Sequence, residues 1–73
     1  MRYEVVLGFN TKQWWIYDNQ TDEYIDLPIL VLSATKQFSS DTDEQGRFLK
    51  ALVFTLPEWL YDKKYRYCGN MEI

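Results

Sequence analysis

Residues 12–27 carry the sequence pattern of a β-hairpin, and this pattern constrains the fold more than any other. The segment KQWWIYD is rich in aromatic and β-branched residues, and EYIDL follows after a polar turn at residues 19–22. Proline 28 ends the pattern because it has no N–H to donate to a strand ladder. Upstream, apolar residues alternate at Tyr3, Val5, Leu7 and Phe9, which predicts a preceding strand.

Residues 29–56 fit two patterns equally well. As strands, Phe48, Leu52, Phe54 and Leu56 would share one face, and the segment DEQG would supply a hairpin turn. The run Val53-Phe54-Thr55 favours this interpretation, because these residues form helices poorly. As helices, the segment would begin after Pro28 and present an apolar stripe. That stripe would comprise Phe48, Leu49, Leu52, Val53 and Leu56.

The segment PEWLYDKK predicts a short amphipathic helix over residues 57–64. Pro57 suits the first helical position, Glu58 the positive N-terminal end, and Lys63 and Lys64 the negative C-terminal end. We expect the adjacent Trp59 and Leu60 to pack this helix onto the sheet.

The chain has 73 residues, which predicts a single small domain, residues 1–73. Apolar residues make up 47% of it, as in globular proteins, and no apolar run reaches the length of a membrane helix. The first residues, MRYEVV, lack the apolar core of a signal peptide. The single cysteine, Cys68, cannot form an internal disulfide, so we expect a cytoplasmic protein.

An acidic strand ending in Leu27-Pro28 and the downstream segment VFTLPEWLYDKK resemble a family of small phage and prophage accessory proteins. In those proteins an acidic strand runs into LPKS and is followed by VPEWLAEKKGL. The resemblance covers residues 12–64 and implies a compact, mostly β protein encoded by a mobile element and acting in the cytoplasm of a bacterial host.

With this resemblance, we expect a mostly β fold. It would be a small twisted antiparallel sheet or partly closed barrel with one short C-terminal helix. The alternative is an α+β fold, in which an N-terminal hairpin sheet is followed by two helices at residues 28–38 and 43–55.

The charge pattern points to a binding protein. The net charge is −3, and the acids gather in segments without bases, which makes duplex DNA an unsuitable partner. We expect an acidic, aromatic face that binds a protein partner with a basic surface, and that inhibits a host nucleic-acid-processing or defence complex. A merely solvated acidic surface is the other explanation. The residues assigned to this face are Asp18, Asp22, Glu23, Asp26, Asp41, Asp43, Glu44 and Trp15.

Catalysis is not expected, because the chain contains no histidine and its serines have no suitable neighbouring base. The segment Asp41-Thr-Asp43-Glu-Gln45-Gly46 resembles half of a calcium loop, but Leu52 stands where a bidentate glutamate is required. We therefore predict no catalytic residue, no metal and no cofactor.

The alternative function is binding of single-stranded nucleic acid. A small sheet can stack unpaired bases on aromatic side chains, here Trp15 or Tyr17. Basic side chains would then neutralise the phosphates, and the candidates are Lys63, Lys64 and Arg66.

Overall fold

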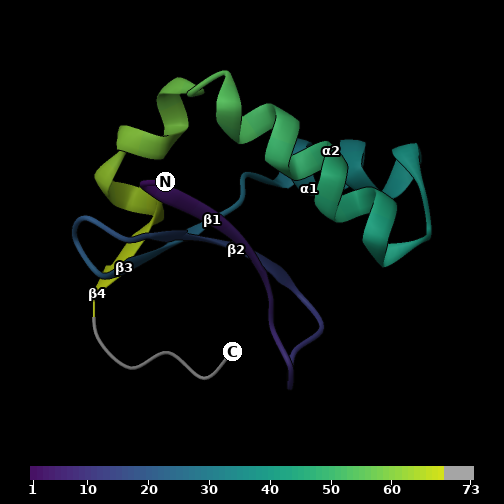
Figure 1. The fold of residues 1–73 in the computed structure, drawn as a ribbon, viewed down its shortest axis with the longest axis horizontal. Helices are drawn as coiled ribbons and strands as arrows, with labels where there is room; N and C mark the ends of the chain where they lie inside the picture. The colour runs from purple at the N-terminus through teal and green to yellow at the C-terminus, as the bar shows by residue number, and fades with distance from the viewer. Residues whose placement is uncertain (69–73) are drawn as a thin grey trace.

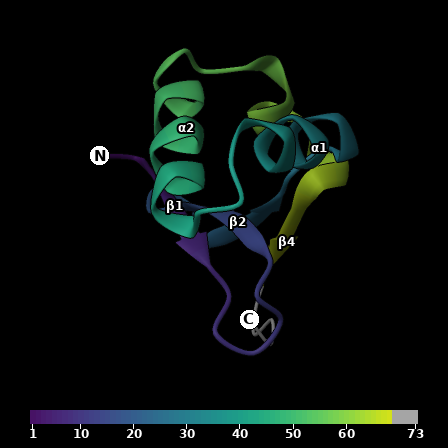
Figure 2. The same ribbon diagram turned by 90° about the vertical axis from the view of Figure 1, so that its right-hand side faces the viewer.

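The computed structural model describes residues 1–68 and shows a four-stranded sheet with two α-helices on one face (Figures 1 and 2). The strands lie in the order β1-β2-β3-β4, and every neighbouring pair is antiparallel. Along the chain, the elements are β1 (Tyr3–Leu7), β2 (Trp14–Asp18), β3 (Glu23–Asp26), α1 (Ile29–Phe38), α2 (Thr42–Phe54), the 3-10 turns η1 (Glu58–Tyr61) and η2 (Lys63–Tyr65), and β4 (Arg66–Cys68).

The predicted hairpin is confirmed, and the predicted first strand is confirmed over Tyr3–Leu7, whereas Phe9 lies beyond its end and is 82% exposed. β2 and β3 pair with Ile16 opposite Ile25, and the turn between them closes with a hydrogen bond from the Asp22 amide to the Asp18 carbonyl, 2.8 Å. Asp22 adopts a left-handed conformation with φ 56°, which aspartate tolerates better than most residues. The turn therefore requires a residue such as Asp22 that tolerates a left-handed backbone.

Two helices, Ile29–Phe38 and Thr42–Phe54, occupy most of residues 29–56, so the expectation of a mostly β fold with one helix is wrong and the α+β alternative fits. Asp41 caps α2, because its side chain accepts a hydrogen bond from the Asp43 amide at 2.8 Å. Leu49 and Val53 then lie buried on the face that α2 turns toward the sheet. Strand pairing would have required Phe54 and Leu56 on a packed face, but they are 67% and 53% exposed.

The predicted α-helix at residues 57–64 is replaced by the two 3-10 turns. Asp62 has extended backbone angles between them, and its carboxylate accepts a hydrogen bond from the Lys64 amide at 3.1 Å. An aspartate that binds the local backbone in this way competes with a continuing helix. Leu60 is fully buried as expected, whereas Trp59 is only partly buried and packs against the edge of the core.

The core lies between the helices and one face of the sheet. Side chains alternate along each strand, so odd positions of β1 and even positions of β2 point toward the helices. The buried apolar cluster consists of Tyr3, Ile16, Ile25, Leu27, Leu49, Val53 and Leu60. The opposite face of the sheet carries no helix of the described chain (Figure 2).

Candidate binding surface on the open face of the sheet

The face of the sheet that the helices leave uncovered, here called the open face, is lined by aromatic residues. In the strand register Tyr17 pairs with Tyr24, which in turn pairs with Tyr67. Trp15 lies two residues before Tyr17 in β2, on the same face, and pairs with Asp26. Paired residues of adjacent strands point to the same side, so four aromatic side chains from three strands share this face.

The aromatic rings of the open face contact one another in two pairs. The rings of Tyr17 and Tyr24 lie 5.0 Å apart at 57°, and those of Trp15 and Tyr67 lie 6.0 Å apart at 80°, edge to face. Trp15 is only 7% exposed, and its buried indole N–H finds no acceptor within residues 1–68. The three tyrosines are half-buried. A partner would therefore contact the tyrosines rather than the buried Trp15, which packs against Tyr67.

Carboxylates surround these rings and hold two of the tyrosine hydroxyls. Tyr17 donates a hydrogen bond to Asp22 at 2.5 Å, and this bond to a carboxylate raises the pKa of Tyr17 to about 12. Tyr67 donates to Asp26 at 3.2 Å. Burial and then the charge of Asp26 raise the pKa of Tyr67. Glu4, which pairs with Tyr17, is exposed on the same face. No lysine or arginine occupies a strand position of the open face within the described residues.

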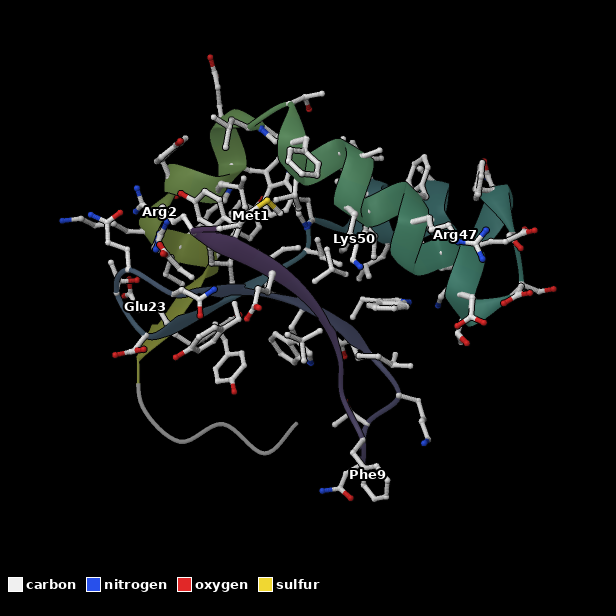
Figure 3. The ribbon with its side chains drawn as sticks, viewed as in Figure 1. Met1, Arg2, Phe9, Glu23, Arg47 and Lys50 are labelled. Atoms are coloured by element: carbon white, nitrogen blue, oxygen red, sulfur yellow. The ribbon has the colours of Figure 1, made fainter. Side chains whose placement is uncertain are left out.

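Asp18 and Glu23 belong to the opposite, helix-covered face, where they form an ion-pair cluster. Arg2 donates two hydrogen bonds to Asp18, both at 3.1 Å, and Arg66 donates at 2.9 Å to Asp18 and at 3.0 Å to Glu23. Arg66 also donates to the Leu60 carbonyl. Figure 3 shows Arg2 and Glu23 at the same end of the molecule. The cluster joins the residue before β1 to the last residue of β2, the first residue of β3 and the first residue of β4.

The protonation of Asp18 follows from this cluster. Burial alone would raise the pKa of the Asp18 carboxyl, but hydrogen bonds from Arg2, Arg66 and the Gln20 amide together lower it below its ordinary value. Asp18 is fully buried and remains ionised, so it does not present its carboxylate to a partner. Arg66 is likewise occupied by carboxylates and only 11% exposed, which removes it as a free phosphate ligand.

The remaining predicted site residues lie elsewhere. Asp41, Asp43 and Glu44 stand at the N-terminal end of α2, where acidic side chains favour the helix dipole. Lys63 and Lys64 belong to η2, and Lys64 lies 3.9 Å from Asp62 in an exposed ion pair. The structure thus divides the predicted acidic set into three groups, and only Asp22 and Asp26 accompany Trp15 and Tyr17.

Four residues of the open face were not in the predicted set: Glu4, Val6, Tyr24 and Tyr67. The two-residue period of the strands would have placed Tyr24 beside Asp26, because both occur in EYIDL. Tyr67 carried no such signal, because β4 has only three residues and pairs with a strand far away in the sequence.

Comparison with protein families, with characterised proteins and with solved structures finds no significant match to this chain. Within residues 1–68, no group of three or more acidic, cysteine or histidine side chains is arranged to hold a metal ion. None of the described helices is both long and apolar enough to span a bilayer.

Proposed function

We propose that this protein is a non-enzymatic binding protein whose open face recognises arginine side chains on a basic protein partner. One observation carries the proposal: the face combines three partly exposed tyrosines with carboxylates, and no lysine or arginine occupies its strand positions within the described residues. A guanidinium stacks on aromatic rings and donates in a plane to carboxylates, so this combination suits arginine.

The hydroxyl–carboxylate pairs support this preference. Each carboxylate offers about four acceptor positions. The bonds from Tyr17 to Asp22 and from Tyr67 to Asp26 leave further lone pairs on both acids. They also orient the carboxylates before a partner arrives, which reduces the entropy lost on binding.

Single-stranded nucleic acid suits the same face less well. Stacking of bases is available on the tyrosines, but Glu4, Asp22 and Asp26 would repel the phosphates. Arg66, one of the three basic side chains expected to bind phosphates, already donates hydrogen bonds to Asp18 and Glu23. Nucleic-acid binding therefore serves as the competing outcome of the test.

A partner whose own task is to bind nucleic acid is the natural target, because it already carries a basic surface. Covering that surface would inhibit it by competition for its arginines. The origin from a phage or other mobile element, and the action inside a bacterial cell, belong to this proposal and rest on the resemblance of LP and LPEWL alone.

The test uses a capped peptide, Gly-Arg-Gly-Arg-Gly, and its citrulline analogue, which keeps the planar shape without the charge. Amide and ring NMR resonances are followed as each peptide is added. We expect the arginine peptide to shift the resonances of Tyr17, Tyr24 and Tyr67 in a salt-dependent manner, and the citrulline peptide to have little effect.

The double variant Glu4→Gln, Asp26→Asn should weaken this binding. The matched double variant Asp43→Asn, Glu44→Gln removes the same charge at the N-terminal end of α2 and should bind as the wild type does. If both double variants bind equally, or if a thymidine oligonucleotide shifts the tyrosines while the arginine peptide does not, the proposal is wrong.

A further inference from the structure

The second surface of interest is the outer edge of β1. This strand lies at one end of the sheet order, so no described strand pairs with its outer side. The Asn19 amide donates to the Arg2 carbonyl at 2.7 Å, and the Gly8 amide donates to the Gln13 carbonyl at 2.8 Å. These bonds flank β1 and belong to the register in which Val5 pairs with Ile16.

The direction of the backbone groups of β1 follows from this register. Residues of an antiparallel pair alternate between bonded and non-bonded positions, so Glu4 and Val6 exchange hydrogen bonds with β2. The N–H and C=O groups of Tyr3, Val5 and Leu7 consequently point away from β2, toward the free edge. Unpaired groups of this kind are the template on which an additional strand forms.

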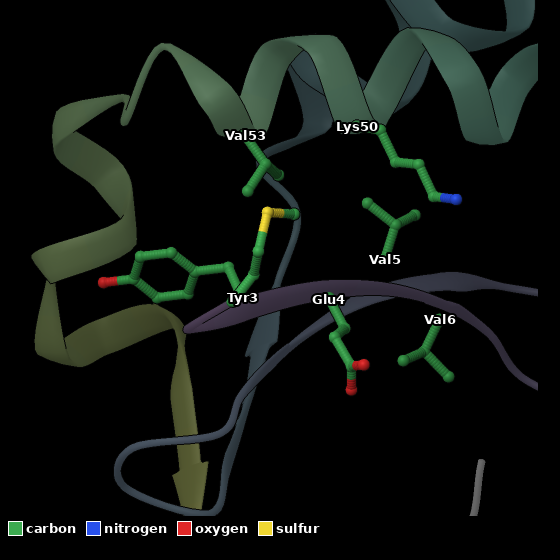
Figure 4. A pocket seen from close by; sticks show the side chains of 7 residues that line it. Tyr3, Glu4, Val5, Val6, Lys50 and Val53 are labelled. Atoms are coloured by element: carbon green, nitrogen blue, oxygen red, sulfur yellow. The ribbon is translucent and has the colours of Figure 1, made fainter.

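A groove accompanies this edge on the side of α2. It encloses about 460 Å³ and is lined by Tyr3, Val5, Lys50 and Val53, together with Met1, Glu4 and Val6. Figure 4 shows Val5 pointing up from β1 toward Lys50 of α2, whereas Glu4 and Val6 point to the opposite side. A second hollow of about 390 Å³ shares Met1, Tyr3 and Val53 with the groove and extends it at one end.

The two ends of the extended groove differ in chemistry. One end is apolar, with Phe54, Leu56 and Tyr61 each more than half exposed. Leu56 has a left-handed backbone with φ 50°, a position where glycine would be unstrained, so an exposed leucine there is costly. The other end carries Lys50 and Arg47, which border a third hollow beside Val5 together with one acid, Asp43. Neither cation forms an ion pair within residues 1–68.

We propose that the free edge of β1 and the groove beside α2 bind an extended acidic segment of a protein partner as a fifth strand of the sheet. The backbone of the segment pairs with Tyr3, Val5 and Leu7. Its alternate side chains turn toward α2, where an aspartate or glutamate meets Lys50 and an apolar residue reaches Phe54, Leu56 and Tyr61. This site lies on the helix-covered side of the sheet, borders the open face at Glu4, and favours acidic side chains through Lys50 and Arg47.

A second copy of this chain is a less suitable occupant. Antiparallel pairing of two β1 strands about Val5 would bring Lys50 of each copy to the same place, and like charges across an interface oppose association. An acidic segment instead uses both unpaired cations. The positive charges of Lys50 and Arg47 therefore favour an acidic segment of another protein over a second copy of this chain.

The test uses a capped peptide, Thr-Glu-Thr-Glu-Thr-Leu-Thr, whose glutamate and leucine side chains fall on one side of a strand. We expect NMR titration to shift the amides of β1 and the resonances of Lys50, and hydrogen exchange at Tyr3, Val5 and Leu7 to slow on binding. Methylation of one alternate set of peptide nitrogens should abolish binding, and methylation of the other set should not, because only one set faces β1.

Three protein variants test the site by changing the protein instead of the peptide. Lys50→Glu should weaken binding about five- to tenfold, as expected for reversing one exposed charge contact. Lys36→Glu, an equal charge change on α1, should have little effect. Val5→Pro removes an outward N–H without breaking the bonds to β2, and should abolish strand addition. Because proline at residue 5 can also disturb packing, the NMR resonances of β2 and β3 are used to check that the Val5→Pro variant is folded.

Several outcomes would overturn the proposal. Equal tolerance of both methylated peptides would exclude backbone pairing, and equal affinities of Lys50→Glu and wild type would show that Lys50 does not contact the peptide. Concentration-dependent dimerisation through β1 would make a second copy the occupant. Shifts on the open face instead of β1 would place the peptide on the other surface, and the single variant Asp26→Asn, which leaves the lining of the groove unchanged, distinguishes that case.

Discussion

Replacing Asp18 with asparagine tests whether the buried ion-pair cluster holds the sheet together. The side chain of Asp18 is 0% exposed, and that of Arg66 is 11% exposed. Removing one partner of a buried ion pair costs about 3–5 kcal/mol, because the other charge stays buried without its counterion. Arg66 keeps Glu23 at 3.0 Å and the Leu60 carbonyl, so we expect the lower end, about 3 kcal/mol.

A loss of that size is large for a chain of this length, whose core supplies only about 3–5 kcal/mol of net stability. At about 4–8 °C per kcal/mol for a small domain, the melting temperature should fall by about 12–24 °C. Urea unfolding followed by tryptophan fluorescence gives the free energy directly. The matched control is Asp62→Asn, which weakens an exposed pair with Lys64 and should change stability by less than about 0.5 kcal/mol.

The pH dependence separates the charge of Asp18 from its shape. The pKa of folded Asp18 lies below its unfolded value of about 3.9. The stability that it contributes is therefore present above pH 4 and is lost as the pH falls through the folded pKa. The difference in the free energy of unfolding between wild type and Asp18→Asn should therefore become smaller below pH 4. A difference under 1 kcal/mol at pH 7, or one that is unchanged in acid, would refute this account.

Three further variants examine the surfaces and the core. Asp22→Asn should return the pKa of Tyr17 from about 12 toward the ordinary value near 10, measured by NMR titration of its ring; an unchanged pKa would mean that Asp22 is not the cause. Leu56→Gly should leave stability unchanged or raise it by up to about 1 kcal/mol in thermal unfolding, because relief of the left-handed strain exceeds the entropic cost of glycine; a loss above 1 kcal/mol would contradict this. Leu60→Ala should cost about 3 kcal/mol in urea unfolding because Leu60 is fully buried, and a loss below 1 kcal/mol would show that the 3-10 turn is not docked.

The first three strands could be predicted because their signals are local. Alternation from Tyr3 to Leu7 and the aromatic run in β2 depend only on neighbouring residues, and the turn before β3 needs a residue such as Asp22 that tolerates a left-handed backbone. The prediction failed at residues 29–56, where the two patterns fitted equally well and the resemblance to small phage proteins decided for strands, in agreement with the β propensity of residues such as Val53. Packing of Leu49 and Val53 against the sheet overrides that intrinsic preference.

One local signal in the sequence would have indicated a helix at residues 42–54 instead of strands. Asp41 followed by Glu44 three residues later matches a capping pattern at the start of a helix, and Asp41 does cap α2. In the sequence those acids were instead assigned to the binding face. Charge patterning alone does not separate a capping acid from a binding acid or from one buried with arginines, such as Asp18. That distinction requires the strand register.

The pairing of β3 with β4 has a consequence for the order in which the protein folds. β1, β2 and β3 are joined by short turns, whereas Arg66 reaches Asp18 across 48 residues of chain. Contacts between distant residues form late, because closing the long loop costs entropy before any contact forms. While the chain is being synthesised, the outer edge of β3 stays unpaired and Asp18 lacks Arg66 until β4 emerges. A nascent chain that ends before residue 66 would therefore present two open sheet edges, and association with other nascent chains would compete with its folding.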